Sequence, residues 1–212
     1  MPKHGGKQVA RKPQARKGEG VPVHVSSSNP TSFLGLPSRA ISVDLSSAPV
    51  PERKYFAEVC TVTMLEHSAR IMFGQPQFGV KRLRTLVMVA MSRRSVIALL
   101  SSLDQMQSPS LEEICAAEGL APEISPPIEE EPVQVVELSA NFTLCGVSST
   151  EACVDFFEAS PFSLGVAVQS DTLHVDPVVR VSLTTPLLLG MVMELRKGAT
   201  NWLGRDKQGE QK

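Results

Sequence analysis

An internal repeat constrains the fold of this 212-residue chain more than any other feature. A shift of 83 positions places Ala57-Glu58-Val59 on Ala140-Asn141-Phe142. A further block matches at a shift of 92, so the second copy has about nine more residues in one loop. Because fixed-period self-similarity is typical of duplicated units, the sequence predicts two tandem copies. The other aligned pairs are Ile71 with Val154, Phe73 with Phe156, Val87 with Val179, Val89 with Val181, Met91 with Leu183, Ser92 with Thr184, Ala98 with Gly190 and Leu103 with Leu195.

Each copy is expected to begin with three strands. In the second copy, Ser148-Ser149-Thr150 predicts a turn between strands at 139–147 and 151–157. That turn would place Phe142 opposite Phe156 and Leu144 opposite Val154, giving the hairpin one apolar face. Copy one has Val59, Thr61, Ile71 and Phe73 in these places. The third strands show period-two alternation at Leu83, Val87, Val89 and Met91, and at Val175, Val179, Val181 and Leu183.

A helix follows the three strands in both copies. Ser92 is positioned to cap a helix over 93–106, and Thr185 to cap the second, with Pro186 in its first turn. A capping box of Ser110 and Glu113 predicts a further short helix at 111–118. We therefore expect an α+β fold of two tandem β-β-β-α copies, a pseudo-dimer of antiparallel sheets with a helix packed on each. The helical stripes expected in the core are Val96, Leu99, Leu100 and Leu103, and Leu188, Met191, Val192 and Leu195.

The composition along the chain suggests five segments. Residues 1–50 are expected to be a flexible basic N-terminal arm, and 51–107 the first, basic copy. Residues 108–132 would hold the short helix and a Pro/Glu-rich linker. The second, acidic copy would cover 133–197, and a polar C-terminal tail 198–212.

Short motifs in the second copy carry a family resemblance. They are Ala140-Asn141-Phe142, Asp155-Phe156, Val179-Arg180-Val181 and Thr184-Thr185-Pro186. In this pattern the chain resembles a small bacterial and archaeal family, uncharacterised and catalogued as a domain of unknown function, present here in two tandem copies. The first copy is degenerate, since Glu58 replaces the Asn and Met72 the Asp. The family has no established catalytic residues, so the resemblance transfers no site.

The net charge of −1 conceals a strong segregation of charge. Residues 53–94 carry eight basic and two acidic residues, whereas 129–195 carry ten acidic residues and one basic. Opposite charges predict attraction between the copies or head-to-tail assembly of molecules. The basic residues also fit phosphate binding. The candidate nucleic-acid-binding residues are Lys3, Lys7, Arg11, Lys12, Arg16, Lys17, Lys81, Arg82 and Arg84.

Motifs for catalysis or metal binding are missing from the sequence. It has no Gly-x-Ser-x-Gly elbow, no phosphate-binding Gly-rich loop and no Cys-x-x-Cys pair. Cys145 and Cys153 are expected to be direct cross-strand neighbours, able to pair on oxidation or to share a soft metal ion, or else to be simple buried thiols. We expect no enzyme activity, no catalytic or metal-ligating residues and no cofactor.

The function that these features favour is binding. The chain is expected to be a non-catalytic protein-binding or assembly protein that uses its sheet edges and complementary charged faces, with another protein or itself as partner. The alternative is a nucleic-acid-associated protein that binds phosphates through the basic arm and first copy. No apolar run reaches the roughly 18 residues of a membrane span, and the N-terminus lacks a secretion signal. A cytoplasmic location is therefore expected.

Overall fold

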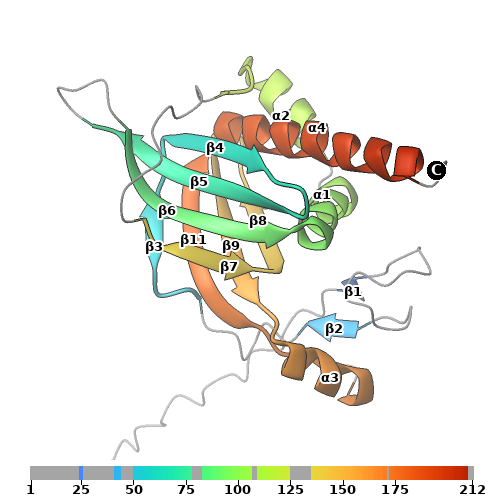
Figure 1. The fold of residues 1–212 in the computed structure, drawn as a ribbon. Coiled ribbons are helices and arrows are strands. Elements are labelled where there is room, and N and C mark those ends of the chain that lie inside the picture. Colours follow the sequence, from blue (N-terminus) through green and yellow to red (C-terminus); the bar gives the residue numbers. More distant parts are fainter. Residues whose placement is uncertain are drawn as a thin grey trace, which may run out of the picture.

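The computed structural model describes residues 24–25, 41–43, 50–77, 83–106, 109–124, 135–170 and 172–209. In these ranges the chain has an α+β fold, with two four-stranded sheets, one small sheet and helices around them (Figure 1). The α+β class predicted from the sequence is thus confirmed.

The first sheet has the strand order β4-β5-β6-β7. Its first three strands form an antiparallel meander, in which the buried residues alternate as the period-two pattern predicts. The fourth strand comes from much later in the chain and runs parallel to β6, with Met88 opposite Glu137. The strands are β4 (Val59–Met64), β5 (Ser68–Pro76), β6 (Leu83–Ser92) and β7 (Glu137–Ala140).

The second sheet has the order β3-β11-β9-β8. Here too, three antiparallel strands are completed by a parallel strand from elsewhere, because β3 pairs with β11 and Lys54 lies opposite Arg180. The segment before each meander therefore supplies the edge strand of the other sheet. The strands are β3 (Lys54–Phe56), β8 (Phe142–Val147), β9 (Glu151–Glu158) and β11 (Asp176–Thr184).

The hairpin β8–β9 differs from the predicted register by one residue. Phe142 lies opposite Phe157, not Phe156, and Leu144 lies opposite Asp155, not Val154. The cause is the turn: Ser148 pairs with Glu151, its N–H donating to the Glu151 carbonyl at 2.8 Å, so the loop has two residues and not three. A one-residue slip moves every side chain of a strand to the other face. The prediction for the first copy is wrong in the same way. Val59 and Thr61 were expected on the apolar face, but they lie on the outer face of β4, and Cys60 is buried instead.

Two of the three predicted helix starts are confirmed. Helix α1 (Arg93–Met106) is capped by Ser92, whose hydroxyl accepts a hydrogen bond from the Ser95 N–H at 3.2 Å. Helix α2 (Leu111–Ala117) has the capping box of Ser110 and Glu113.

The predicted cap of the last helix is wrong by one residue. In α4 (Thr185–Gly209), the Leu187 N–H donates to the hydroxyl of Thr184 at 3.2 Å. The Thr185 hydroxyl instead donates to the Ser148 carbonyl at 3.0 Å, which fastens the helix start to the β8–β9 turn.

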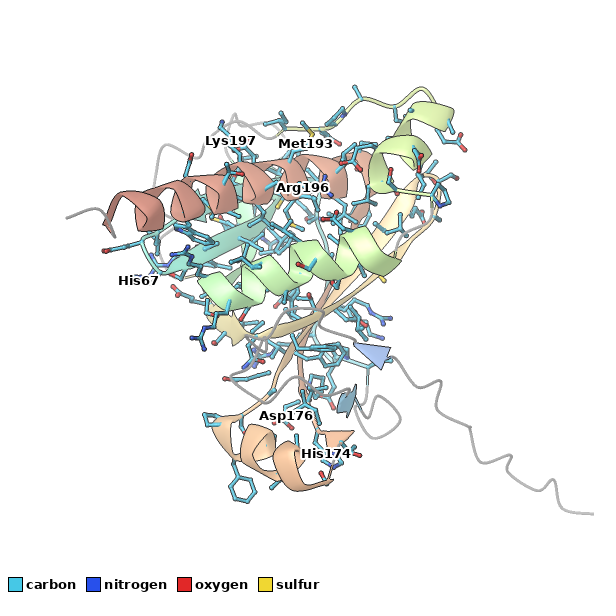
Figure 2. The ribbon with its side chains drawn as sticks, turned by 90° about the vertical axis from the view of Figure 1, so that its right-hand side faces the viewer. His67, His174, Asp176, Met193, Arg196 and Lys197 are labelled. Atoms are coloured by element: carbon cyan, nitrogen blue, oxygen red, sulfur yellow. The ribbon has the colours of Figure 1, made fainter. Side chains whose placement is uncertain are left out.

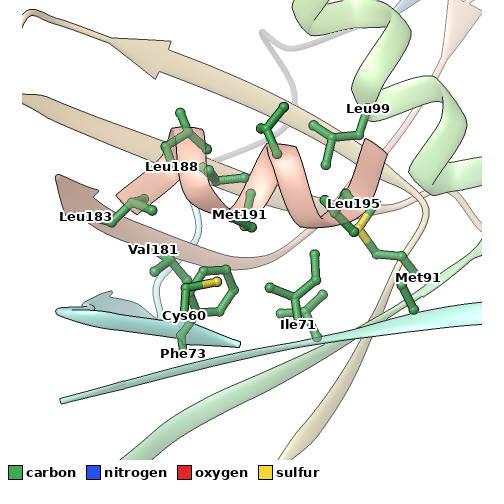
Figure 3. Packing of buried hydrophobic residues seen from close by; sticks show 14 of the residues in the cluster. Cys60, Ile71, Phe73, Met91, Leu99, Val181, Leu183, Leu188, Met191 and Leu195 are labelled. Atoms are coloured by element: carbon green, nitrogen blue, oxygen red, sulfur yellow. The ribbon is translucent and has the colours of Figure 1, made fainter. Parts of the chain in front are cut away.

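One hydrophobic core joins the two large sheets and the helices α1 and α4 (Figure 3). Phe73 of β5 meets Phe156 of β9 edge to face, with ring centroids 5.9 Å apart. Helix α4 packs against β4 and helix α1 packs against β8, so each helix contacts the first strand of the other sheet. The predicted helical stripes are buried in this core, from Val96 to Leu103 in α1 and from Leu188 to Leu195 in α4.

The chain after residue 197 is not a polar tail. Helix α4 continues to Gly209, and the Trp202 side chain is only 4% exposed. Its indole N–H donates to the Leu65 carbonyl at 2.8 Å, and the Arg93 guanidinium lies 5.8 Å from the ring centroid. Trp202 thus ties the last turns of α4 to the β4–β5 turn and to the start of α1.

Two short strands are described in the predicted N-terminal arm. They are β1 (His24–Val25) and β2 (Ile41–Val43), which form a small sheet with β10 (Thr172–Leu173) in the order β1-β2-β10. The arm's other residues before Val50, including its six candidate cations up to Lys17, lie outside the described residues.

Candidate protein-binding surfaces

The connection between β9 and β11 carries a helix, α3 (Pro161–Ser170), that was not among the helices predicted from the sequence. Its cap is Ser160, whose hydroxyl accepts from the Ser163 N–H at 3.1 Å, and Pro161 takes the first helical position. The Asn141 amide makes two hydrogen bonds with the backbone of Ala159, at 2.7 and 2.8 Å. This clamp fixes the base of the insertion to the second sheet.

A second, small core holds α3 in place. Its buried members are Phe157, Ala159, Ala167, Leu173 and Val175, with Phe142 and Leu144 packed against them. The insertion therefore covers the outer face of β8 and β9 at this end of the sheet.

The outward side of α3 is apolar and open to solvent. Phe162 is 80% exposed and Val166, one turn later, is 39% exposed. The helix contains no charged residue between Pro161 and Ser170. Figures 1 and 2 show that α3 projects from the molecule at the end opposite α4, with Asp176 beside it in Figure 2.

Two acidic residues flank this apolar side. Glu158 and Asp176 lie directly opposite each other where β9 and β11 end, and both are exposed. Like charges directly opposite one another are destabilising. Neither forms an ion pair with a Lys or Arg among the described residues, and the sequence has no Lys or Arg from 138 to 179; the exposed His174 lies two residues before Asp176. We name Glu158, Phe162, Val166 and Asp176 the α3 tip.

A second exposed aromatic side chain lies on the edge strand β3. Phe56 is 50% exposed, and Lys54, two residues earlier, is on the same face of the strand and also exposed. The Gln75 amide donates to the Phe56 carbonyl at 2.9 Å. Arg84 is the cross-strand partner of Gln75 and is exposed, so it lies on the same side of the hairpin. We name Lys54, Phe56 and Arg84 the β3 patch.

The net charge of the β3 patch is modestly positive. Its cations Lys54 and Arg84 and the adjacent Arg53 have two exposed acidic neighbours on the chain, Glu52 and Glu58. Lys81 and Arg82 directly precede β6 in the sequence, but they lie outside the described residues.

Other cations of the first copy are engaged within the chain. Arg70 forms an ion pair with Glu137 at 3.5 Å, which links the two copies, and Arg93 stacks on Trp202. Of the nine residues predicted to bind nucleic acid, only Arg84 belongs to the described part of the chain, where it is exposed.

A half-buried ion pair crosses the outer face of the second sheet. Arg180 donates from Nε to Oδ1 of Asp155 at 2.6 Å and from Nη2 to Oδ2 at 2.5 Å. The hydrogen bonds with Asp155 raise the pKa of Arg180. Such bidentate geometry fixes the two strands in register and leaves neither group free for chemistry.

One pocket among the described residues was considered as a site for chemistry or for a metal ion. A pocket of about 200 Å³ lies where β4, α4 and residues 123–124 meet. It contains no histidine, and within the described ranges no cluster of three His, Cys, Asp or Glu side chains could hold a metal ion. The backbones approach closely in its lining, because a Cβ at Gly190 would collide with the Glu123 carbonyl oxygen.

Cys145 and Cys153 are not the cross-strand neighbours that the sequence predicted. Cys145 lies opposite Val154 and Cys153 lies opposite Gly146, so the one-residue shift puts the two thiols on opposite faces of the hairpin. None of the four cysteines, all of which lie in the described ranges, forms a disulfide. Burial, followed by the nearby Cys153 and Asp155, raises the pKa of Cys145 to about 12, and burial also raises the pKa of Cys60.

These thiols should react slowly in the folded protein. A rise in pKa from 9.0 to about 12 lowers the thiolate fraction of Cys145 at pH 8 by about 1,000-fold. We expect iodoacetamide at pH 8 to leave Cys60 and Cys145 unmodified in the native protein and to modify both in urea. Mass spectrometry of tryptic peptides measures this. Rapid native alkylation of Cys145 would contradict its raised pKa.

Comparisons with known proteins found no match among protein-family models, curated proteins or solved structures. Of the helices in the described ranges, none combines the length and the hydropathy needed to cross a bilayer.

The sequence contained partial signals for both surfaces. The uncharged apolar stretch 161–168 and the additional residues of the second copy pointed to an insertion, but not to a helix with an exposed face. Phe56 stood beside Arg53 and Lys54 without a pattern to show that it would lie on a sheet edge.

Proposed function

We propose that this chain is a non-catalytic protein-binding protein, and that the α3 tip is its principal docking surface. The observation that carries the proposal is the exposure of Phe162 beside the directly opposed acidic pair Glu158 and Asp176. Burying an exposed aromatic ring removes apolar area from water, and central aromatic anchors are typical binding hot spots. A cationic partner would also relieve the repulsion between the two carboxylates.

The chemistry of the α3 tip favours a particular partner class. Its two carboxylates repel phosphates, so a polyanion is disfavoured there. A protein surface with an apolar centre and Lys or Arg at its rim complements both features. The engagement of Arg70 and Arg93 within the chain also favours protein binding over the nucleic-acid alternative.

Photocrosslinking in cells tests this proposal. With benzoylphenylalanine in place of Phe162, we expect crosslinks to a protein, reduced at least about tenfold by the additional changes Glu158→Lys and Asp176→Lys. The matched control places the same probe at Met193, which is 41% exposed on α4, far from α3. Identical crosslinks from both positions, or none from position 162, would remove the α3 tip as a docking surface.

We also infer that the two sheets are tandem copies of one β-β-β-α unit, arranged as a pseudo-dimer. The pairing registers support this: Val62 with Ile71 becomes Cys145 with Val154 after adding 83 to each number. The parallel edge strands β7 and β3 match as well. Met88 lies opposite Glu137, and the positions that correspond to them at the shifts of 92 and 83, Arg180 and Lys54, also lie opposite each other.

The strand irregularities and caps agree with the same shifts. In the first sheet the register shifts next to the pair of Phe73 and Val87. In the second sheet it shifts next to the corresponding pair, Phe156 and Val179. The helix caps Ser92 and Thr184 also correspond. Such agreement in unusual local features supports duplication more strongly than shared apolar residues do.

A further inference from the structure

We propose that the partner of the α3 tip is the β3 patch of a second copy of this chain, so that molecules associate head to tail. This inference rests on the proposed function and names the partner. Each surface centres on one exposed aromatic side chain, Phe162 or Phe56. Two carboxylates border the first ring, whereas around the second the cations Arg53, Lys54 and Arg84 outnumber the carboxylates Glu52 and Glu58 by one, so the two surfaces have opposite net charge.

The α3 tip and the β3 patch of one molecule cannot contact each other. Packing of Ala167 against the second small core holds α3 at the end of β9 and β11, with Phe162 facing solvent. The β3 patch belongs to an edge strand that pairs with Arg180–Ser182, farther along β11. A contact between unlike patches on two molecules is heterologous, and it leaves one free tip and one free patch on every dimer.

The aromatic rings and the charges play different parts in this contact. Burial of Phe162 and Phe56 provides the attraction, because apolar area is removed from water on both sides. Lys54 and Arg84 facing Glu158 and Asp176 set the orientation and increase the association rate. These exposed charges are screened by salt, so association should be strongest at low ionic strength.

Sedimentation velocity of the full chain, treated with nuclease, tests the proposal. We expect concentration-dependent association at low salt that weakens as salt is added. The tip variant Phe162→Asp and the patch variant Phe56→Asp should each weaken it at least about tenfold. Met193→Asp, an exposed apolar position on α4, should leave it unchanged. Circular dichroism verifies that all variants fold.

Mixing the two defective variants gives the sharpest result. The tip variant keeps its patch and the patch variant keeps its tip, so the mixture should form a one-to-one dimer and nothing larger. A monomeric wild type, association unaffected by Phe162→Asp, a mixture that stays monomeric, or association that nuclease abolishes would each overturn the proposal.

The outcome also separates this inference from the proposed function. If the wild type is monomeric but a probe at position 162 still crosslinks another protein in a charge-dependent way, only self-assembly is overturned. If position 162 crosslinks nothing, both the docking role of the α3 tip and self-assembly through it are overturned.

Discussion

A chain divided within residues 125–134 is expected to fold only when both halves are present. The first half would lack β7, which completes its sheet beside β6, and the second would lack β3, which completes its sheet beside β11. The first half would also lose α4, which packs against β4, and the second half would lose α1, which packs against β8. Because one core joins both halves, each alone would expose much of its apolar surface to water.

Fluorescence and circular dichroism of the separate and mixed halves measure this effect. Trp202 belongs to the second half but is buried against Leu65 and Arg93 of the first. Mixing should therefore shift the tryptophan emission to shorter wavelength and restore a cooperative unfolding transition. As a control, an intact chain cut in the linker after folding should remain one complex. A cooperative transition in either half alone would show that the units are independent.

Replacing Trp202 with Ala should lower the free energy of unfolding by about 3–5 kcal/mol, the range for large aromatic side chains removed from a core. The change leaves a cavity and deprives the Leu65 carbonyl of its donor. Trp202→Phe, which keeps most of the ring but loses the N–H, should cost about 1–3 kcal/mol.

Urea denaturation, followed by circular dichroism, measures these losses. The matched control is Asn201→Ala, since Asn201 is the exposed neighbour of Trp202 on α4 and should change stability by no more than about 0.5 kcal/mol. An equally small effect of Trp202→Ala would mean that the end of α4 does not stabilise the fold.

Much of the secondary structure could be predicted because local patterns determine it. The period-two runs of β6 and β11, the caps at Ser92 and Ser110 and the apolar stripes of α1 and α4 depend on neighbouring residues only. The polar composition after residue 197 was misleading, because one buried Trp202 and its partners on β4–β5 and α1 determine that end of the helix.

Pairings between distant segments could not be predicted. Whether β7 joins its own meander or the other sheet depends on which edge is free after folding, and no local pattern encodes this. The register of β8–β9 depended on a choice between two and three loop residues, and this choice decided the positions of Cys145 and Cys153. The candidate binding surfaces were hidden for the same reason, since exposure is a property of the assembled fold.

Hydrogen–deuterium exchange at low ionic strength and increasing protein concentration shows whether the α3 tip and the β3 patch recognise each other. Protection should increase with concentration only in peptides that cover residues 158–166 and 176, and residues 53–56 and 84. It should disappear in the Phe162→Asp variant. Protection that grows on another face, or association without added protection at these two surfaces, would contradict the account.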